Sequence, residues 1–321
     1  MKNSVNNNLN FPKKKKPWDV SDYELVLMAS LSLLFLFVFA YLPMYGVTLA
    51  FKDGDGEINV LRSLFADNWV GFYNFKQFFA DDKFYTVISN TLSINLLMLC
   101  IEFPAPIIFA LFLNEIQHTR YKKTVQTIST FPHFLSWTIF GGIILALTNV
   151  NTGVTTPIFE FLKLADQTNK INLVTSDYIW VLLIISSLIK SVGWGSIIYL
   201  AAITGINPEI YEAATLDGAG RFQRMRYITL PSISATITVF FILRISNMLD
   251  NSFEMFYIFQ NGVNLSKSEV LTTYIWKVSI GSQQMRYSYA SALGLFNSII
   301  GLILLLLGNF VSKKITGKGI Y

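Results

Sequence analysis

The chain has 321 residues and a net charge of +5, with 52% hydrophobic and only 14% charged residues, whereas soluble globular domains average about 25% charged. A single cysteine excludes an intramolecular disulfide, and two isolated histidines exclude a histidine-based metal cluster, so we expect no metal site. The apolar residues fall into long blocks, which predicts an all-α integral membrane protein.

Six blocks are long enough to cross a hydrocarbon core of roughly 30 Å at about 1.5 Å per residue. They cover residues 25–45, 86–112, 125–147, 178–204, 232–258 and 289–311. The first block follows the basic run KKKK at 13–16, a flank that signal peptides also carry. Because the block is long and no small-residue cleavage site follows it, we expect an uncleaved first span.

The distribution of positive charge predicts the orientation. With the N-terminus inside, the inner connecting segments hold 14 lysines and arginines and the outer ones hold 9. By the positive-inside rule, the tails 1–24 and 312–321 are both expected in the cytoplasm, on either side of a membrane domain at 25–311. Topology accounts for the basic excess, so no nucleic-acid partner is expected. Residues 205–231 then form a cytoplasmic loop.

That loop contains the stretch EAATLDGAGRFQRMRYITLP at 212–231. Asn207 is a good helix N-cap and Pro208 suits a first helical position. Gly218 and Gly220 permit a sharp turn, after which a second short helix carries three arginines. One interpretation is a surface hairpin whose arginines obey the positive-inside rule. The other is a docking element for a cytoplasmic partner.

The loop resembles the EAA loop in permease subunits of ATP-binding-cassette (ABC) importers, which has Glu-Ala-Ala, three residues, Gly, nine residues and Ile-x-Leu-Pro. The matching residues are Glu212, Ala213, Ala214, Gly218, Ile228, Leu230 and Pro231. The stretch at 71–92 is similar to the entry to the second span of sugar permeases. FPHFLSW at 131–137, the stretch at 193–214 and YSYASALGLFNS at 287–298 resemble the oligosaccharide and polysaccharide-fragment branch.

The resemblance implies a six-helix permease whose loop at 207–231 is the coupling helix for a separate ATPase. The residues expected to form this contact are Glu212, Ala213, Ala214, Asp217, Gly218, Arg221, Ile228, Leu230 and Pro231. The chain has no G-x-x-x-x-G-K-[ST] loop, so it is not expected to be an enzyme, and ATP and Mg²⁺ are expected on the partner ATPase dimer. No cofactor is expected on this chain.

The resemblance also implies the remaining partners and the mechanism. They are a second homologous permease, an extracellular lipid-anchored or periplasmic sugar-binding protein, and an oligosaccharide substrate. The expected location is a bacterial plasma membrane, and the expected mechanism is alternating access driven by ATP.

Polar residues inside predicted spans are candidates for a substrate passage. On a continuous fifth helix, five of them would share a sector of about 120°: Arg244, Asn247, Asp250, Asn251 and Glu254. They either line the passage or join helices through an Arg244–Glu254 or Arg244–Asp250 pair. Asn297 on the sixth span presents the same choice.

Lys190 and Trp194 lie four residues apart on the fourth span. A tryptophan can stack on a sugar ring, although packing beside two glycines is favoured here. Glu102, close to Pro104, suggests a broken helix near a cavity. His133 is expected to be a satisfied interface group.

The sequence also allows a second function, that of an ion-coupled carrier. An ion-coupled secondary sugar transporter would use Asp250 and Glu254 as proton or sodium sites, but it would not need the loop at 212–231. A membrane enzyme would need a catalytic constellation, and none is apparent. A scaffold role has no motif in its favour.

Overall fold

The computed structural model describes residues 19–55, 60–164, 170–249, 252–281 and 285–316. Within these ranges the chain is almost entirely helical, and the extended backbone makes one isolated bridge, between Lys52 and Trp69. The all-α expectation is therefore confirmed for the described part. The chain divides into two compact units, residues 1–48 and 49–321.

The first unit contains α1 (Val20–Leu36), which begins at the N-cap Asp19 with a capping box completed by Asp22. The helical backbone continues through the π-helix η1 (Phe37–Tyr41) into the 3-10 helix η2 (Leu42–Phe51). No side chain of α1 is buried. A helix that is apolar on all sides is suited to contact with lipid or with a partner chain.

The second unit contains the other helices. Its α-helices are α2 (Val60–Phe65), α3 (Tyr73–Ala80), α4 (Lys83–Glu102), α5 (Pro104–Asn114), α6 (Thr119–Thr130), α7 (Trp137–Leu147), α8 (Thr155–Phe161), α9 (Ile179–Thr204), α10 (Pro208–Leu216), α11 (Arg221–Arg224), α12 (Leu230–Ser232), α13 (Ser234–Ser246), α14 (Phe253–Phe259), α15 (Leu265–Ser268), α16 (Leu271–Ser279) and α17 (Tyr287–Thr316). The 3-10 helix η3 (Phe131–Phe134) lies between α6 and α7, and the π-helix η4 (Met225–Thr229) lies between α11 and α12.

Four described helical stretches are long and apolar enough to cross a membrane: Val20–Phe51, Lys83–Asn114, Ile179–Thr204 and Tyr287–Lys314. Two bent pairs pass the same criteria together. Thr119–Phe134 and Trp137–Leu147 meet at 104°, and Arg221–Ser232 and Ser234–Ser246 meet at 64°. The range of four to six apolar spans includes the expected six.

The segment 232–258, predicted as one span, is not one helix. α13 ends at Ser246, and α14 begins only at Phe253. Polar residues are frequent between them, and short polar side chains compete with helical hydrogen bonds. The prediction that five polar residues share one face of a continuous fifth helix is therefore wrong, because Arg244 lies on α13 and Glu254 lies on α14. Asp250 and Asn251 lie outside the described residues.

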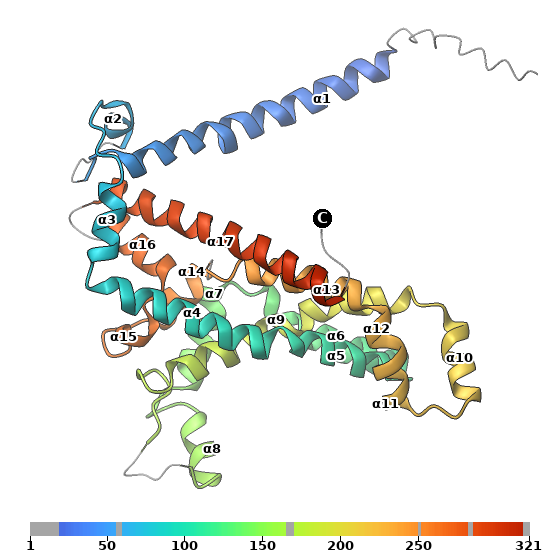
Figure 1. Cartoon of the computed structure of the whole chain (residues 1–321). Coiled ribbons are helices and arrows are strands. Elements are labelled where there is room, and N and C mark those ends of the chain that lie inside the picture. The colour runs from blue at the N-terminus through green and yellow to red at the C-terminus, as the bar shows by residue number, and fades with distance from the viewer. Residues whose placement is uncertain (1–18, 56–59, 165–169, 250–251, 282–284, 317–321) are drawn as a thin grey trace, which may run out of the picture. The chain divides into compact units, whose positions relative to one another are not determined.

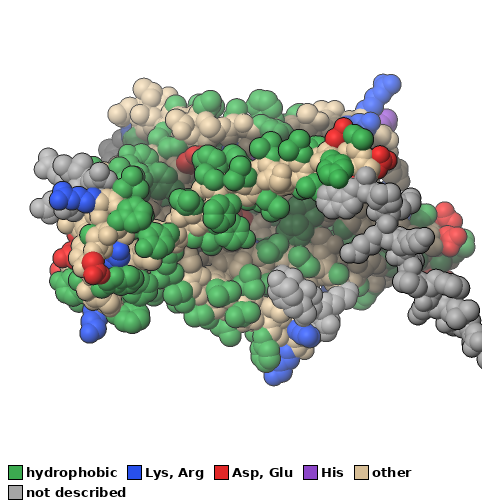
Figure 2. Space-filling view, turned by 90° about the horizontal axis from the view of Figure 1, so that it is seen from above, with side chains coloured by type: hydrophobic (Ala, Val, Ile, Leu, Met, Phe, Trp, Pro, Cys, Tyr) green, Lys and Arg blue, Asp and Glu red, His purple; other side chains and the backbone are tan. Residues whose placement is uncertain are grey.

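Helix α9 occupies the centre of the second unit and packs against α4, α5, α6, η3 and α14. Its buried residues join two apolar clusters, one around Leu183 with α4 and α14, and one around Tyr199 with α5. A third cluster joins Phe78 and Tyr289 of α3 and α17. On the face shown in Figure 2, hydrophobic side chains predominate, and charged side chains lie mainly towards the margins.

The two ends of the second unit carry different elements (Figure 1). Helices α10, α11 and α12 lie together at one end, and α10 extends beyond the ends of α5 and α9. Helices α3, α15 and α16 lie towards the other end. The predicted cytoplasmic loop is therefore a projecting helical element at one end of the bundle.

Candidate functional site: a projecting loop and a pocket at broken helices

The loop helix α10 forms as its sequence suggests. Asn207 is the N-cap, and its side chain accepts a hydrogen bond from the Glu209 N–H at 3.1 Å. Pro208 is the first helical residue. The turn after α10 is made at Gly218, whose φ is +80°, a left-handed conformation that favours glycine. These local predictions are confirmed.

Two side-chain hydrogen bonds hold α10 against the segment that follows. Arg224 Nη1 donates to Thr215 Oγ1 at 2.8 Å. The hydroxyls of Tyr211 and Thr229 lie 2.9 Å apart. The loop is thus a braced hairpin that continues through η4 and α12 into α13.

Most of the residues expected at the ATPase contact are accessible. Exposed positions are Glu212, Ala213, Asp217, Gly218, Arg221, Leu230 and Pro231, while Ala214 and Ile228 are half-buried. Leu216, which the motif does not include, is 90% exposed at the end of α10. The hairpin therefore exposes the acidic residues Glu212 and Asp217, small residues and several large apolar side chains, among them Leu216 and Phe222.

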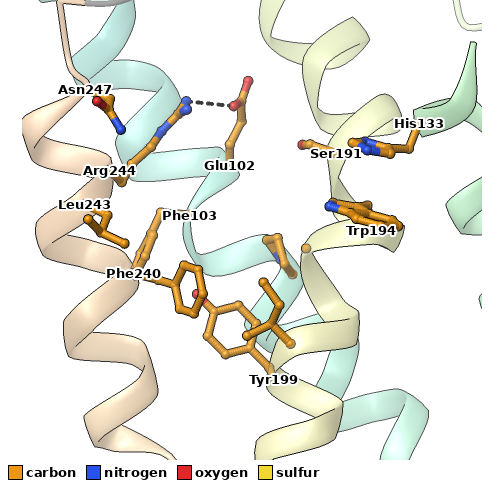
Figure 3. Close-up of a pocket in the computed structure, with 13 residues that line it drawn as sticks. Glu102, Phe103, His133, Ser191, Trp194, Tyr199, Phe240, Leu243, Arg244 and Asn247 are labelled. Carbon is orange, nitrogen blue, oxygen red and sulfur yellow. Dashed lines mark hydrogen bonds and ion pairs between the residues drawn. The ribbon is translucent and has the colours of Figure 1, made fainter. Parts of the chain in front are cut away.

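A pocket of about 410 Å³ lies between α4, α5, η3, α9 and α13. Figure 3 shows its labelled lining residues, with polar groups in one part and aromatic rings in another. The lining includes three predicted passage residues, Trp194, Arg244 and Asn247. Glu102 and His133, which the sequence placed near a cavity or an interface, also line it.

Glu102 and Arg244 form an ion pair in the wall of this pocket. Arg244 Nη2 donates to Glu102 Oε2 at 3.0 Å, across 142 residues of sequence. Glu102 is the last residue of α4, directly before a one-residue interruption at Phe103, but α4 and α5 still form one span, Lys83–Asn114, so the predicted break is only local. Among the described residues Arg244 does not pair with Glu254, because α13 ends before Glu254, and its observed partner comes from α4. Asp250, the other partner considered, lies outside the described residues.

His133 and Trp194 stack in parallel on the opposite side. Their ring centroids are 4.4 Å apart with an interplanar angle of 2°, and Phe134 approaches Trp194 edge-on at 5.9 Å. Trp194 remains 44% exposed. The wall offers an aromatic surface of the kind on which sugar rings stack.

The other candidates lie elsewhere. Lys190 does not line the pocket: its ammonium bonds to backbone carbonyls of Pro132, His133 and Leu135, which agrees with the packing interpretation. Glu254 is exposed on α14. Asn297 lines a second cavity of about 320 Å³, which Asn247 also borders. The structure thus brings Trp194, Arg244 and Asn247 together and leaves Lys190 and Glu254 out.

Helical spans, a projecting loop and a pocket lined by aromatic rings and an ion pair are features expected of a membrane permease. The chain belongs to the family of binding-protein-dependent transport system inner membrane components, whose model matches residues 102–317.

Relatives and solved structures agree with this assignment. The chain is 40% identical to Protein LplB of Bacillus subtilis over 94% of this chain and 92% of that protein. It is 38% identical to the polygalacturonan/rhamnogalacturonan transport system permease protein YteP of the same organism, over 92% and 90%. A crystal structure of a bacterial alginate ABC transporter in complex with an alginate pentasaccharide-bound periplasmic protein matches with a TM-score of 0.82 and 33% identity, over 94% of this chain and 97% of that chain.

The chain is therefore a permease for carbohydrate uptake, a non-enzymatic component of an ABC transporter and a multi-pass protein of the bacterial plasma membrane. Two lining residues, Glu102 and His133, had weak signals in the sequence: an acid close to two prolines, and a Pro-His pair within an apolar span.

Proposed function

We propose that this chain is one of two unlike permease subunits of an importer for oligosaccharides. An extracellular binding protein delivers the sugar, and an ATPase dimer that holds ATP and Mg²⁺ drives alternating access from the cytoplasm, where both chain termini lie. The ion-coupled alternative is disfavoured by the family assignment, which groups this chain with binding-protein-dependent systems.

The observation that carries the proposal is the connection between the loop and the pocket. The hairpin that holds the EAA residues continues through η4 and α12 into α13, and α13 carries the pocket residue Arg244. A displacement of the loop by an ATPase would be transmitted along this helical path to the pocket wall.

We further propose that the substrates are fragments of acidic polysaccharides. One similar protein is named as a polygalacturonan/rhamnogalacturonan transport permease, and a similar solved structure is of an alginate ABC transporter. Arg244 supports this choice because a guanidinium can bind a sugar carboxylate through two parallel hydrogen bonds. The aromatic wall formed by His133 and Trp194 would hold the apolar face of the ring.

The first test is co-purification of the tagged full chain from its native membrane. We expect an ATPase and a second permease to accompany the wild type. Glu212→Lys reverses an exposed charge on α10, and Gly218→Asp places a side chain at a φ of +80°. Both should lose the ATPase and retain the second permease.

Glu160→Lys is the matched control, because it makes the same charge reversal on α8, away from the loop. It should retain every partner. If the wild type purifies without an ATPase, or if the loop variants keep it, the account of the loop as the docking site is wrong.

A further inference from the structure

The third apolar span is broken beside the pocket. Helix α6 leads into η3 (Phe131–Phe134), Leu135 is extended, and α7 leaves at 104° to the preceding helix. Such a break frees backbone carbonyls from their helical partners. At membrane depth there is no bulk water to bind them, so the protein must supply the donors.

Lys190 supplies donors to this bend from the middle of α9. Its Nζ donates to the carbonyls of Pro132 and His133, each at 3.2 Å, and also to the carbonyl of Leu135. An ammonium has three N–H donors, and the bend presents three carbonyls to it. Lys190 is only 8% exposed. The hydrogen bonds of its ammonium group therefore all go to the backbone of the bend.

The same ammonium also contacts the start of the helix after the bend. It lies 5.2 Å from the ring centroid of Trp137, the first residue of α7. A cation over an indole face is attracted by the ring quadrupole. Lys190 thus contacts both the bend and the first residue of the helix that follows it, α7.

Gly193, three residues further along α9, allows α9 to pack closely against the end of α6, where the chain enters the bend. A Cβ at this position would lie 2.2 Å from the carbonyl oxygen of Ser129 and 2.6 Å from the nitrogen of Thr130. Both of those atoms are rigid backbone at the end of α6. Only glycine permits this approach without displacing α6 or α9.

The adjacent residue of α9 is Trp194, whose ring stacks on His133 from the bend itself. Contacts at three positions of α9, Lys190, Gly193 and Trp194, therefore fix the bend relative to this ring. We infer that Lys190 is a positioning residue that holds the broken third span so that His133 lies flat against Trp194 and completes the aromatic wall of the pocket. The transport role of that wall rests on the proposed function, but the positioning role does not.

The chain has two histidines, which makes the stack directly observable. When only this full-length chain carries histidine ¹³C-labelled at Cε1 and its accompanying subunits are unlabelled, the assembled complex should give two histidine ring signals by NMR. His118→Gln assigns them. A ring lying flat over an indole is shifted upfield by the ring current, so the His133 signal should be upfield and should lose that shift in Trp194→Leu.

Lys190→Met should remove most of the upfield shift, because the methionine has no donor for the three carbonyls. Ile189→Met is the matched control, since Ile189 is an exposed neighbour on the same helix, and it should keep the shift. Gly193→Ala should also lose it, whereas Gly142→Ala, at a helical glycine with open space around it, should not.

A Lys190→Met protein that keeps the His133 shift would overturn the inference. If Lys190→Met does not fold, Lys190→Gln provides the same test: a reduced shift supports positioning and an unchanged one overturns it. Uptake of labelled galacturonate and alginate oligosaccharides by vesicles containing the complete transporter separates the two proposals. Loss of the shift with unchanged uptake supports positioning by Lys190 and removes the pocket from the transport pathway.

Discussion

The loop and the pocket are built by contacts of very different range. Within the loop, the bonds join residues that are near in sequence: Asn207 with Glu209, and Thr215 with Arg224. In the pocket, Glu102 of α4 pairs with Arg244 of α13, 142 residues away. The loop is exposed, while the carboxylate of the pocket pair is 7% exposed.

This difference determines how each region should respond to substitution. An exposed, locally braced hairpin can lose a side chain without disturbing the packing of the spans. A buried pair that joins two spans cannot, because removal of one partner leaves an uncompensated charge. Loop variants should therefore change partner binding at nearly constant stability, and pocket variants should change stability itself.

The largest effect is expected for Glu102→Leu, which leaves the Arg244 guanidinium without its carboxylate. Breaking a buried ion pair in this way costs about 3–5 kcal/mol. Because the Arg244 side chain is 41% exposed and can be partly solvated, we expect about 2 kcal/mol. Thermal unfolding of the purified complex should show a Tm lower by several degrees.

The double variant Glu102→Leu/Arg244→Met provides the control, since replacement of both charges by apolar groups is often nearly neutral. It should recover most of the lost stability. A double variant as unstable as Glu102→Leu would show that the carboxylate acts through contacts other than Arg244.

A smaller and local effect is expected for Arg224→Met, which removes the 2.8 Å hydrogen bond to Thr215. A hydrogen bond from a charged donor is worth about 1.5–3 kcal/mol, and less when it is exposed to water as here. Amide hydrogen exchange should become faster within α10, while the Tm of the complex stays near the wild-type value. Arg221→Met, at an exposed position in the same helix as Arg224, should leave exchange in α10 unchanged, and a general loss of Tm in Arg224→Met would contradict the local account.

The smallest effect on stability is expected for the protonation of Asp81, which lies outside the apolar spans. Like the ion pair of the pocket, Asp81 is bonded to residues far away in the sequence, Tyr274 and Tyr289. Burial raises the pKa of its carboxyl, but hydrogen bonds from Tyr274, the Lys83 N–H and Tyr289 outweigh burial and hold that pKa below its usual value. The stabilisation from the ionised form is complete above the unfolded pKa of about 3.9. It is lost as the pH falls through the lower pKa of the folded protein.

Unfolding by urea between pH 6 and pH 3 should show this loss of stability in the wild type. Asp81→Asn should be less stable at pH 6 and should lack this part of the pH dependence. If the two proteins lose stability in parallel as the pH falls, Asp81 does not carry the effect.

The sequence allowed correct prediction of features that depend on neighbouring residues. The Asn207 cap, the turn at Gly218 and the interruption after Glu102 each follow from local chemistry. Four of the six apolar blocks also coincide with continuous helical stretches, since long apolar runs have few other stable forms in a bilayer, whereas the blocks 125–147 and 232–258 are interrupted.

Features that depend on distant contacts could not be predicted in the same way. The partner of Arg244 was sought on its own span because helical periodicity relates residues only within one helix. Because α13 ends at Ser246, this periodicity does not extend to Glu254. Glu102 became the partner of Arg244 because the helices pack so that α4 brings its carboxylate close to α13. Likewise, nothing local to Lys190 indicates that its ammonium serves a bend almost 60 residues earlier.

The aromatic part of the pocket has a consequence for the electrical insulation of the cell. The pocket of about 410 Å³, whose wall includes an ion pair, has room for water, and water at membrane depth thins the insulating layer. The membrane potential then falls mainly across the part of the protein that contains no water. Each elementary charge that crosses 100 mV gains or loses about 2.3 kcal/mol. Tyr199 and Phe240, whose rings meet edge to face at 6.1 Å, lie away from the ion pair (Figure 3). Packed rings carry no charge and admit little water, so such rings would confine the water of the pocket and limit the leak of protons and sodium.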